Sequence, residues 1–533
     1  MTTHHSLVSH PANTGRRAGI LLPLFSIRTE NDWGIGDFSG LEKWLKYAAT
    51  TGSGIFQILP INEMPAGQDC PYTALSAFAL DPIYIAVPEV EEITATPAAA
   101  QYLETEEIRG VISGLRNAEK VDYAAVRELK FQTLWMGFHY FYENQWKTGG
   151  KRAKKFAAFR EENAWWLDDY ALFRYLKDAY EWKSWMHWPE AVKNREGAEL
   201  SKLRAEHEKQ ILFFEYLQWI AQQQWDAARK TAAQKKIMLF GDLPFMINQE
   251  SADVWANRDT FDVTREIGAP PDQFSTEGQR WGLPAYNWPQ MQQSDFRWWR
   301  QRVVRGRQLY DLFRLDHLVG FFRTWVIPHD KSAKADFDQK DETLQQQRGE
   351  AFLRAVIDEA YPAMPVAEDL GVIPDFVRET LKKLHIPGYK VTRWEKDLDK
   401  YRDPDKYPHI SLATTSTHDT EMMAEWWGAV PEQERNDFWR MLTGENAAPA
   451  QYGERERLAV LRRIMNSSSS MALFPVQDIL GLADRINTPG TVGDHNWTYR
   501  LPFPLENCKQ IPDFTKRMKQ YKDLVREAGR SVA

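Results

Sequence analysis

Cysteine is scarce in this chain of 533 residues, which contains only Cys70 and Cys508. Two cysteines cannot form a disulfide framework, although the sequence alone leaves a single bridge open. No stretch approaches the roughly 18–20 consecutive apolar residues of a membrane span. Residues 1–17 are polar and lack the apolar core of a secretory signal. These absences predict a cytoplasmic protein that does not contact a membrane.

Charge clusters and cofactor motifs are also missing. The net charge is −7, and no run of basic residues indicates nucleic acid as a partner. Gly34, Gly36 and Gly40 do not have the spacing of a dinucleotide-binding loop, and His207-Glu208 lacks the second histidine of a zinc-binding helix. We therefore expect no cofactor, no metal and no nucleic-acid partner.

Aromatic residues, in contrast, are abundant, with 22 Trp, 20 Tyr and 27 Phe. Many of them must belong to the core. Flat rings also stack on the C–H groups that one face of a sugar presents. The surplus of Trp and Tyr therefore mildly favours a carbohydrate ligand.

An arginine and an aspartate follow an apolar run near the middle of the chain. Residues 309–313 read Leu-Tyr-Asp-Leu-Phe and predict a short buried strand. Side chains alternate along a strand, so Arg314 and Asp316 share one face. The arginine can hold the carboxylate of Asp316 ionised, which suits a nucleophile better than a proton donor. A purely structural Arg–Asp pair is the alternative.

Two further carboxylates follow predicted strands. Glu368 comes directly after the apolar residues 364–367, and Asp419 ends the stretch 410–419. Three carboxylates at three strand ends suit glycosyl transfer, in which one attacks the anomeric carbon and another protonates the leaving oxygen. The third then binds sugar hydroxyls.

Eight short apolar stretches alternate with stretches of helical spacing, which predicts the α/β class and a (β/α)8 TIM barrel. Catalytic groups of such barrels lie at the carboxyl ends of the strands. We expect a loose tail over residues 1–17 and one catalytic domain over residues 18–533. A mainly helical insertion is expected at about 86–230, and an active-site loop insertion at about 246–295. No C-terminal β-sandwich is expected, because the chain ends in helix.

The motifs that carry the three carboxylates resemble one known family. Residues 314–317 read Arg-Leu-Asp-His, residues 367–371 read Ala-Glu-Asp-Leu-Gly, and residues 417–419 read Thr-His-Asp. This order is similar to that of the 4-α-glucanotransferase (amylomaltase) family, glycoside hydrolase family 77, a relative of the α-amylases. The resemblance extends over nearly the whole chain.

The resemblance implies retaining transfer of α-1,4-glucan segments between maltooligosaccharides or starch- and glycogen-type glucans. It implies that Asp316 is the nucleophile, that Glu368 is the general acid and then the general base, and that Asp419 binds hydroxyls of the −1 sugar. Oligomeric state is not indicated. For a retaining mechanism, the two catalytic carboxyl groups are expected about 5–5.5 Å apart.

Five more residues are candidate substrate-binding residues. The resemblance implies that Tyr72 stacks on the −1 glucose and that Trp281 lies in a mobile loop as a sugar platform on the acceptor side. His418 is expected to donate to a hydroxyl at −1, and Arg314 to hold Asp316. Asp242, near the end of the predicted third strand, either contacts sugar or orients the site.

An α-glucan hydrolase of the α-amylase type remains the main alternative. A typical α-amylase carries an Asn-His pair after strand three, whereas residues 241–244 here read Gly-Asp-Leu-Pro. A catalytically silent glucan-binding protein is less favoured, because all three carboxylates are present. The sequence also departs from the family pattern at Leu80-Asp81 and at Tyr389.

Overall fold

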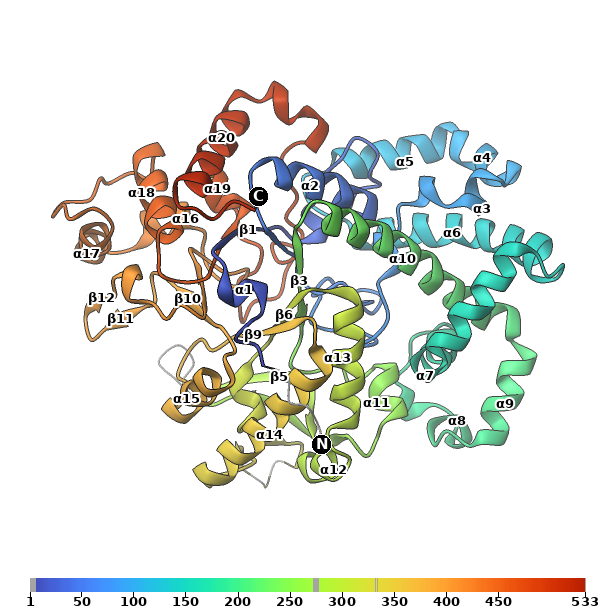
Figure 1. Cartoon of the computed structure of the whole chain (residues 1–533). Helices are drawn as coiled ribbons and strands as arrows, with labels where there is room; N and C mark the ends of the chain where they lie inside the picture. Colours follow the sequence, from blue (N-terminus) through green and yellow to red (C-terminus); the bar gives the residue numbers. More distant parts are fainter. Residues whose placement is uncertain (1–5, 272–277, 331, 333, 533) are drawn as a thin grey trace.

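A closed barrel of eight parallel strands forms the centre of the computed structural model, which describes residues 6–271, 278–330, 332 and 334–532 (Figure 1). The barrel strands, in chain order, are β1 (Arg17–Leu21), β2 (Ile55–Gln57), β3 (Met238–Leu243), β6 (Leu312–Leu315), β9 (Met364–Ala367), β10 (Gly388–Val391), β13 (Ser411–Thr414) and β14 (Met471–Pro475). Each strand pairs with its predecessor and successor, and β14 closes the barrel on β1. The predicted (β/α)8 barrel is confirmed.

Helices surround the barrel and cover the outer faces of its strands. Those outside the N-terminal segment and the two insertions are α2 (Phe38–Thr50), α13 (Arg297–Leu309), α14 (Glu342–Ala360), α15 (Asp375–Leu384), α16 (Met423–Ala429), α17 (Glu432–Thr443), α18 (Glu454–Met465), α19 (Val476–Leu480) and α20 (Pro512–Glu527). Every residue of β6, β9 and β13 is buried, as expected for parallel strands covered on both faces. This explains why they read as continuous apolar runs.

The fourth barrel strand starts later than predicted. Residues 309–313 were expected to form it, but Leu309 is the last residue of α13 and β6 begins at Leu312. Tyr310 connects the two, and its buried ring lies beneath Gly241 of β3, where an added Cβ would meet the ring at 2.3 Å. The apolar run therefore spans a helix end, a connection and a strand.

A mainly helical segment lies between β2 and β3, on the right of Figure 1. Its helices are α3 (Glu91–Thr94), α4 (Pro97–Glu104), α5 (Glu106–Asn117), α6 (Tyr123–Phe141), α7 (Lys151–Ala179), α8 (Glu190–Lys193), α9 (Gly197–Glu206) and α10 (Glu208–Gln234). Trp225 of α10 packs edge-on against Phe38 of α2, at 5.7 Å between ring centroids. The segment is therefore joined to the barrel by aromatic packing.

The segment between β3 and β6 differs from the predicted loop insertion at about 246–295. It contains α11 (Ala252–Ala256), β4 (Phe261–Ala269), β5 (Gln279–Tyr286) and α12 (Trp288–Gln293), while residues 272–277 lie outside the described residues. β4 pairs with β5 and with β7 (Trp325–Pro328), which pairs with β8 (Asp336–Phe337), to form a four-stranded antiparallel sheet. The loop prediction gave weight to the glycines and prolines at 268–271 and missed the strand before them. Trp281 therefore lies on a strand.

The predicted tail over residues 1–17 also differs from the structure. Residues 1–5 lie outside the described residues, but Pro11–Thr14 form helix α1 and Leu7 is buried. Asn13 donates to the carbonyl oxygens of Leu7 and His385, at 2.9 and 3.1 Å. These contacts attach the segment to the barrel before β1 begins at Arg17.

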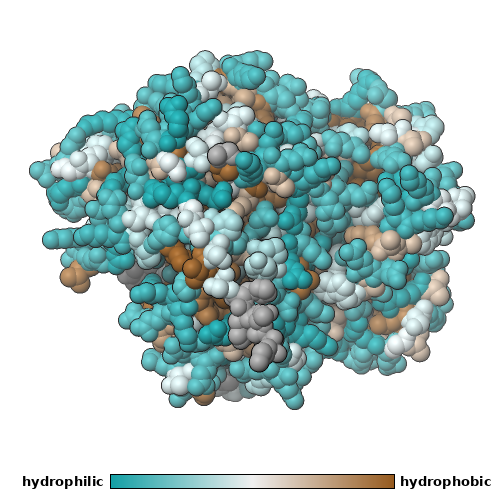
Figure 2. All heavy atoms as spheres, in the orientation of Figure 1, coloured by the Kyte–Doolittle hydropathy of each residue, from teal (hydrophilic) through white to brown (hydrophobic). Residues whose placement is uncertain are grey.

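Hydrophilic residues cover most of the molecular face seen in Figure 2, and hydrophobic residues gather only in small patches. Among the residues that the structure describes, no helix combines the length and apolar character needed to cross a membrane. Most of the buried apolar side chains belong to one continuous core.

A short hairpin, β11 (Lys396–Asp397) and β12 (Lys400–Tyr401), follows β10.

Candidate active site

The candidate residues gather at the carboxyl ends of neighbouring barrel strands. Strand register pairs Asp242 of β3 with Arg314 of β6, and Leu315 of β6 with Ala367 of β9. Asp316 and Glu368 each follow the last residue of their strand, so they emerge side by side at the barrel mouth. This is the end of the barrel at which TIM-barrel enzymes place their chemistry.

Arg314 contacts three carboxylates. Its Nη1 lies 2.8 Å from Oδ1 of Asp316 and 2.9 Å from Oδ2 of Asp242, and its Nη2 lies 3.8 Å from Oε2 of Glu368. Burial alone would lower the pKa of Arg314, but Asp242 and Asp316 outweigh burial and raise this pKa well above its ordinary value. The guanidinium is therefore a permanent positive charge at the centre of the site.

Asp316 has a donor at each carboxylate oxygen. Arg314 contacts Oδ1, and the backbone N–H of Phe245 donates to Oδ2 at 3.0 Å. Both contacts stabilise a negative charge on this carboxylate. The side chain keeps 22% of its surface exposed, so it is accessible from the barrel mouth.

Glu368 is held mainly by main-chain donors. The N–H of His317 donates to Oε2 at 2.8 Å, and that of Leu370 donates to Oε1 at 3.3 Å. Burial, assisted by the charge of Asp316, raises the pKa of Glu368 to about 8 against the opposing effect of Arg314. His317 adopts the left-handed backbone conformation, with φ 45° and ψ 52°, where it presents its N–H to Glu368. Glu368 is therefore protonated at neutral pH while Asp316 has donors suited to a carboxylate.

Asp419 has side-chain partners instead. Nε2 of His418 lies 3.0 Å from Oδ2, and Nδ2 of Asn487 donates to Oδ1 at 2.6 Å. Burial raises the pKa of Asp419, but His418 and the hydrogen bond from Asn487 outweigh burial and lower this pKa to about 2. Asp419 is thus a carboxylate throughout the physiological range. Asn487 was not among the predicted site residues, because it lies in a loop after β14 with no motif of its own.

Tyr72 links the two sides of the site. Its hydroxyl donates to Oδ2 of Asp242 at 2.7 Å and lies 2.9 Å from Nε2 of His418. The rings of Tyr72 and His418 are stacked, with centroids 5.3 Å apart and an interplanar angle of 19°. Trp497, another residue that the sequence did not reveal, packs against both rings.

Asp242 is completely buried beneath these residues. Its Oδ2 is shared by Arg314 and Tyr72, whereas Oδ1 has no hydrogen-bond partner among the described residues. Burial raises the pKa of Asp242 to about 6 despite the charge of Arg314. Of the two predicted roles, this position favours orientation of the site over contact with sugar.

Trp281 lies at the edge of the cluster. It is half-buried on β5, and its ring packs edge-on against His317, at 4.9 Å between centroids. His317 is the residue whose backbone N–H donates to Glu368.

The structure thus brings all eight predicted site residues to one region. Within the described residues, no group of three His, Cys, Asp or Glu side chains has the geometry to hold a metal.

Comparison with known proteins agrees with this geometry. The family model described as 4-alpha-glucanotransferase matches residues 22–506. The 4-alpha-glucanotransferase of Chlamydia pneumoniae is 32% identical over 95% of this chain and 95% of its own length. That of Thermus thermophilus is 31% identical over 86% of this chain and 89% of its own length.

Solved structures give the same result. An amylomaltase from Streptococcus agalactiae in complex with acarbose aligns with a TM-score of 0.81 and 25% identity, covering 97% of this chain and 100% of that one. The amylomaltase of Corynebacterium glutamicum shares the fold, with a TM-score of 0.79 and 20% identity over 96% of this chain and 76% of that one. From the match of the family model and the full-length likeness to its members, the chain belongs to the 4-alpha-glucanotransferase family.

Proposed function

We propose that this protein transfers α-1,4-glucan segments between maltooligosaccharides, with retention of configuration and through a covalent glycosyl-enzyme. The observation that carries the proposal is the contrast between two adjacent carboxyl groups. Arg314 and a main-chain N–H contact Asp316 as donors suited to a carboxylate, while the pKa of Glu368 is raised to about 8. Paired carboxyl groups with opposite protonation states supply the nucleophile and the acid of a retaining glycosidase.

In the first step, Asp316 attacks the anomeric carbon of the −1 glucose and the bond to the glycosidic oxygen breaks. Glu368 gives its proton to that leaving oxygen, so the product leaves as a neutral alcohol. In the second step, the Glu368 carboxylate takes the proton of an acceptor hydroxyl, the acceptor oxygen attacks the same carbon, and the ester to Asp316 breaks. Two inversions give net retention.

The surrounding residues have supporting roles in this proposal. Asp419 and His418 hold hydroxyls of the −1 glucose, and Tyr72 packs over that sugar. Arg314 orients Asp316 through an ion pair, and Asp242 fixes Arg314 and Tyr72 through one oxygen. Trp281 serves as a platform for the acceptor sugar. Buried, fixed polar groups of this kind stabilise developing charge without reorganising during the reaction.

We further propose that residues 18–533 act as one catalytic domain, whose two insertions shape the acceptor cleft. Support comes from contacts between the insertions, where Lys177 of α7 pairs with Glu250 at 3.0 Å and Trp185 donates to the carbonyl of Gln249 at 2.8 Å. A cytoplasmic location is also proposed. It is supported by Cys70 and Cys508, which are both free thiols.

Incubation with maltotriose, with products resolved by chain length, tests the proposal. Glucose together with a ladder of longer maltooligosaccharides is the expected result. Glucose and maltose with nothing longer would identify an α-glucan hydrolase on the same barrel. Loss of both product sets in Asp316→Asn is expected in either case, and full activity of that variant would contradict the assignment of the nucleophile.

A further inference from the structure

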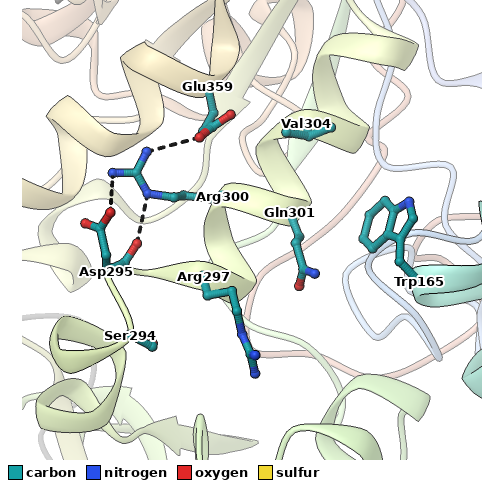
Figure 3. A pocket seen from close by; sticks show the side chains of 8 residues that line it. All are labelled: Trp165, Ser294, Asp295, Arg297, Arg300, Gln301, Val304 and Glu359. Carbon is teal, nitrogen blue, oxygen red and sulfur yellow. Dashed lines mark hydrogen bonds and ion pairs between the residues drawn. The ribbon is translucent and has the colours of Figure 1, made fainter. Parts of the chain in front are cut away.

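A groove lies between α7 and α13, away from the catalytic carboxylates. One cavity of about 310 Å³ is lined from α7, α13 and α14, and the side chains around it are drawn in Figure 3. A second cavity of about 220 Å³ continues toward α11. Both are lined by Trp165, Arg297 and Gln301, so they form one α7–α13 groove. Neither is lined by Asp316 or Glu368.

An exposed aromatic ring forms one wall of the groove. Trp165 keeps 41% of its surface exposed, although most large aromatic side chains of the protein are buried. Its ring contacts Phe78 in a T-shaped arrangement, at 5.0 Å between centroids, and Phe78 in turn packs against Trp298. These contacts hold the ring in place while a large part of its surface stays open. Such a surface suits stacking against the C–H face of a sugar.

Planar polar side chains form the opposite wall. Arg300 is fixed between Asp295 at 2.9 Å and Glu359 at 3.1 Å, as Figure 3 shows. Arg297 and Gln301 make no side-chain hydrogen bond or ion pair with the described residues, and in Figure 3 they project between this network and Trp165. The groove therefore combines a fixed network around Arg300 with two side chains, Arg297 and Gln301, that are available to bind a ligand.

The charges in the groove identify the chemical class of its ligand. Arg297 and Arg300 face four acidic side chains that line the two cavities, so the groove has no positive surplus to attract an anion such as a nucleic acid. The acidic residues are Asp295, Glu359, Asp169 and Asp253. An aromatic platform facing planar hydrogen-bonding groups, without a surplus of positive charge, suits a neutral polyhydroxylated chain. The enzyme already acts on such chains if the proposed function is correct, and the choice of ligand rests on it.

We propose that the α7–α13 groove is a second binding site for α-1,4-glucan, which holds a remote segment of a long chain. Trp165 stacks on one glucose unit, and Arg297 and Gln301 hydrogen-bond to its hydroxyls. A second contact of this kind raises the apparent affinity for a polymer through effective concentration, without altering the reacting site.

The groove also adjoins the segment that carries Tyr72. Ser76 and Phe78 line its second cavity. Asp253 accepts hydrogen bonds from the N–H of Ala77 and from Nε1 of Trp298, both at 3.0 Å. Glucan in the groove therefore lies against the back of the catalytic loop, while the reacting sugar lies at its front.

The test compares Trp165→Ala with Trp135→Ala, a matched control on α6 that is 39% exposed and does not line the groove. Both changes are made in an Asp316→Asn background, so that glucan is bound but not turned over. Retardation in native gels containing amylopectin gives the apparent dissociation constant. Trp165→Ala is expected to raise it roughly five- to tenfold, as for loss of an aromatic anchor, whereas Trp135→Ala leaves it unchanged.

A kinetic measurement in the active enzyme provides the second readout. The ratio of KM for amylose to KM for maltotriose is expected to rise roughly fivefold in Trp165→Ala and in Arg297→Ala, because only the long chain reaches the groove. Unchanged retardation and an unchanged ratio in both variants would overturn the second site while leaving the proposed function intact. Retardation that depends on Trp165 in a protein that makes no ladder from maltotriose would contradict the proposed function instead.

Discussion

At the scale of the residue, the site separates two chemically similar side chains by their surroundings. Asp316 receives a cation and a main-chain donor, whereas Glu368 lies in a more buried place with the cation at 3.8 Å. Desolvation penalises a charged carboxylate, and a close cation compensates for it. The roles proposed for the two groups thus follow from the burial of Glu368 and from the closer contact of Arg314 with Asp316.

Glu368→Gln tests the acid assignment. Since the pKa of Glu368 is raised to about 8, wild-type activity is expected to be retained below that pH and to fall as the pH rises through it. The glutamine variant cannot protonate the leaving oxygen, so its kcat on maltotriose is expected to fall by about 10²- to 10⁴-fold. Its pH profile is expected to lack the decrease in activity at alkaline pH. Steady-state rates from pH 5 to 10 provide the measurement.

A donor with a fluoride leaving group is the control, because fluoride departs without a proton. Glu368→Gln should form the glycosyl-enzyme from a maltosyl fluoride at a rate close to that of the wild type, whereas Asp316→Asn should not. If Glu368→Gln lost the same factor in rate with maltotriose and with the maltosyl fluoride, the substitution would have damaged the site as a whole.

Asn487→Ala tests a residue that the sequence analysis missed. It removes the hydrogen bond to Oδ1 of Asp419, so the pKa of Asp419 is expected to rise from about 2 and the acid limb of the pH profile to move upward. Loss of one hydrogen bond to a charged group corresponds to a decrease in kcat/KM of roughly 10- to 100-fold. The pH dependence of kcat/KM for maltotriose provides the measurement, and an unmoved acid limb would contradict the positioning role.

The sequence could reveal the carboxylates because each follows a strand directly. Asn487, Trp497 and the N–H of Phe245 act from loops that lie far away along the chain, and their contribution depends on how those loops fold back over the barrel mouth. A main-chain donor also leaves no trace in the identity of its residue. These partners could therefore be found only in the structure.

At the scale of the element, the segment with Tyr72 is fixed by a short helix. Asp253 of α11 accepts from the N–H of Ala77 and from Nε1 of Trp298, and the N–H of Ala252 donates to the carbonyl of Leu75 at 2.9 Å. The loop is therefore bound on its buried side before any substrate arrives. Such pre-organisation lowers the entropic cost of binding the sugar.

Asp253→Ala should release this loop. Two buried donors lose their acceptor, which is expected to destabilise the fold by about 1–3 kcal/mol and to raise KM for maltotriose. Asp253→Asn is the matched control, because its amide oxygen still accepts one of the two hydrogen bonds. Denaturant unfolding and steady-state kinetics provide the measurements. If the alanine variant keeps wild-type KM after stability is accounted for, the helix does not position Tyr72.

Element boundaries were predicted less well than element types. The run 309–313 is apolar throughout, and pattern alone cannot separate a helix end from a strand start when both are buried. The strands β4 and β5 belong to a sheet that continues through β7, which pairs with β4 and begins at Trp325, about 55 residues after β4 ends at Ala269. Pairing between such distant segments is a property of the tertiary structure.

At the scale of the whole molecule, the buried carboxyl groups tie stability to pH. Burial raises the pKa of Glu368 to about 8 and that of Asp242 to about 6, above unfolded values of about 4.3 and 3.9. The folded state therefore holds these protons more tightly than the unfolded state. The stability that they contribute is fully present below pH of about 4 and is lost as the pH rises through about 6 and then about 8.

Glu368→Gln should expose this relation in a melting experiment. The amide resembles the protonated acid, so Tm is expected to match the wild type at pH 5 and to exceed it by on the order of 2–4 °C at pH 8.5. Calorimetry at the two pH values provides the measurement. Glu379→Gln, at an exposed position of α15, is the control and should show no such pH dependence. An equal effect at both pH values would disprove the link to titration.

The barrel itself was the feature most open to prediction, because eight buried strands each leave a continuous apolar run in the sequence. The arrangement of the two insertions was not open to prediction in this way. Their packing depends on contacts such as the ion pair of Lys177 with Glu250, which join segments separated by an entire barrel strand. Length and periodicity indicate that an insertion exists but not where it docks.

The main-chain hydrogen bonds to Asp316 and Glu368, the proposed catalytic residues, have a practical consequence for redesign. The donors are the N–H groups of Phe245, His317 and Leu370, and every amino acid except proline supplies such a group. His317 is constrained by its left-handed backbone and Phe245 by its burial, but Leu370 is only partly buried. The side chain of Leu370 can therefore be varied in a mutant library while its main-chain hydrogen bond to Glu368 persists. A search for altered product length can start at this position, which touches a proposed catalytic group through its main chain alone.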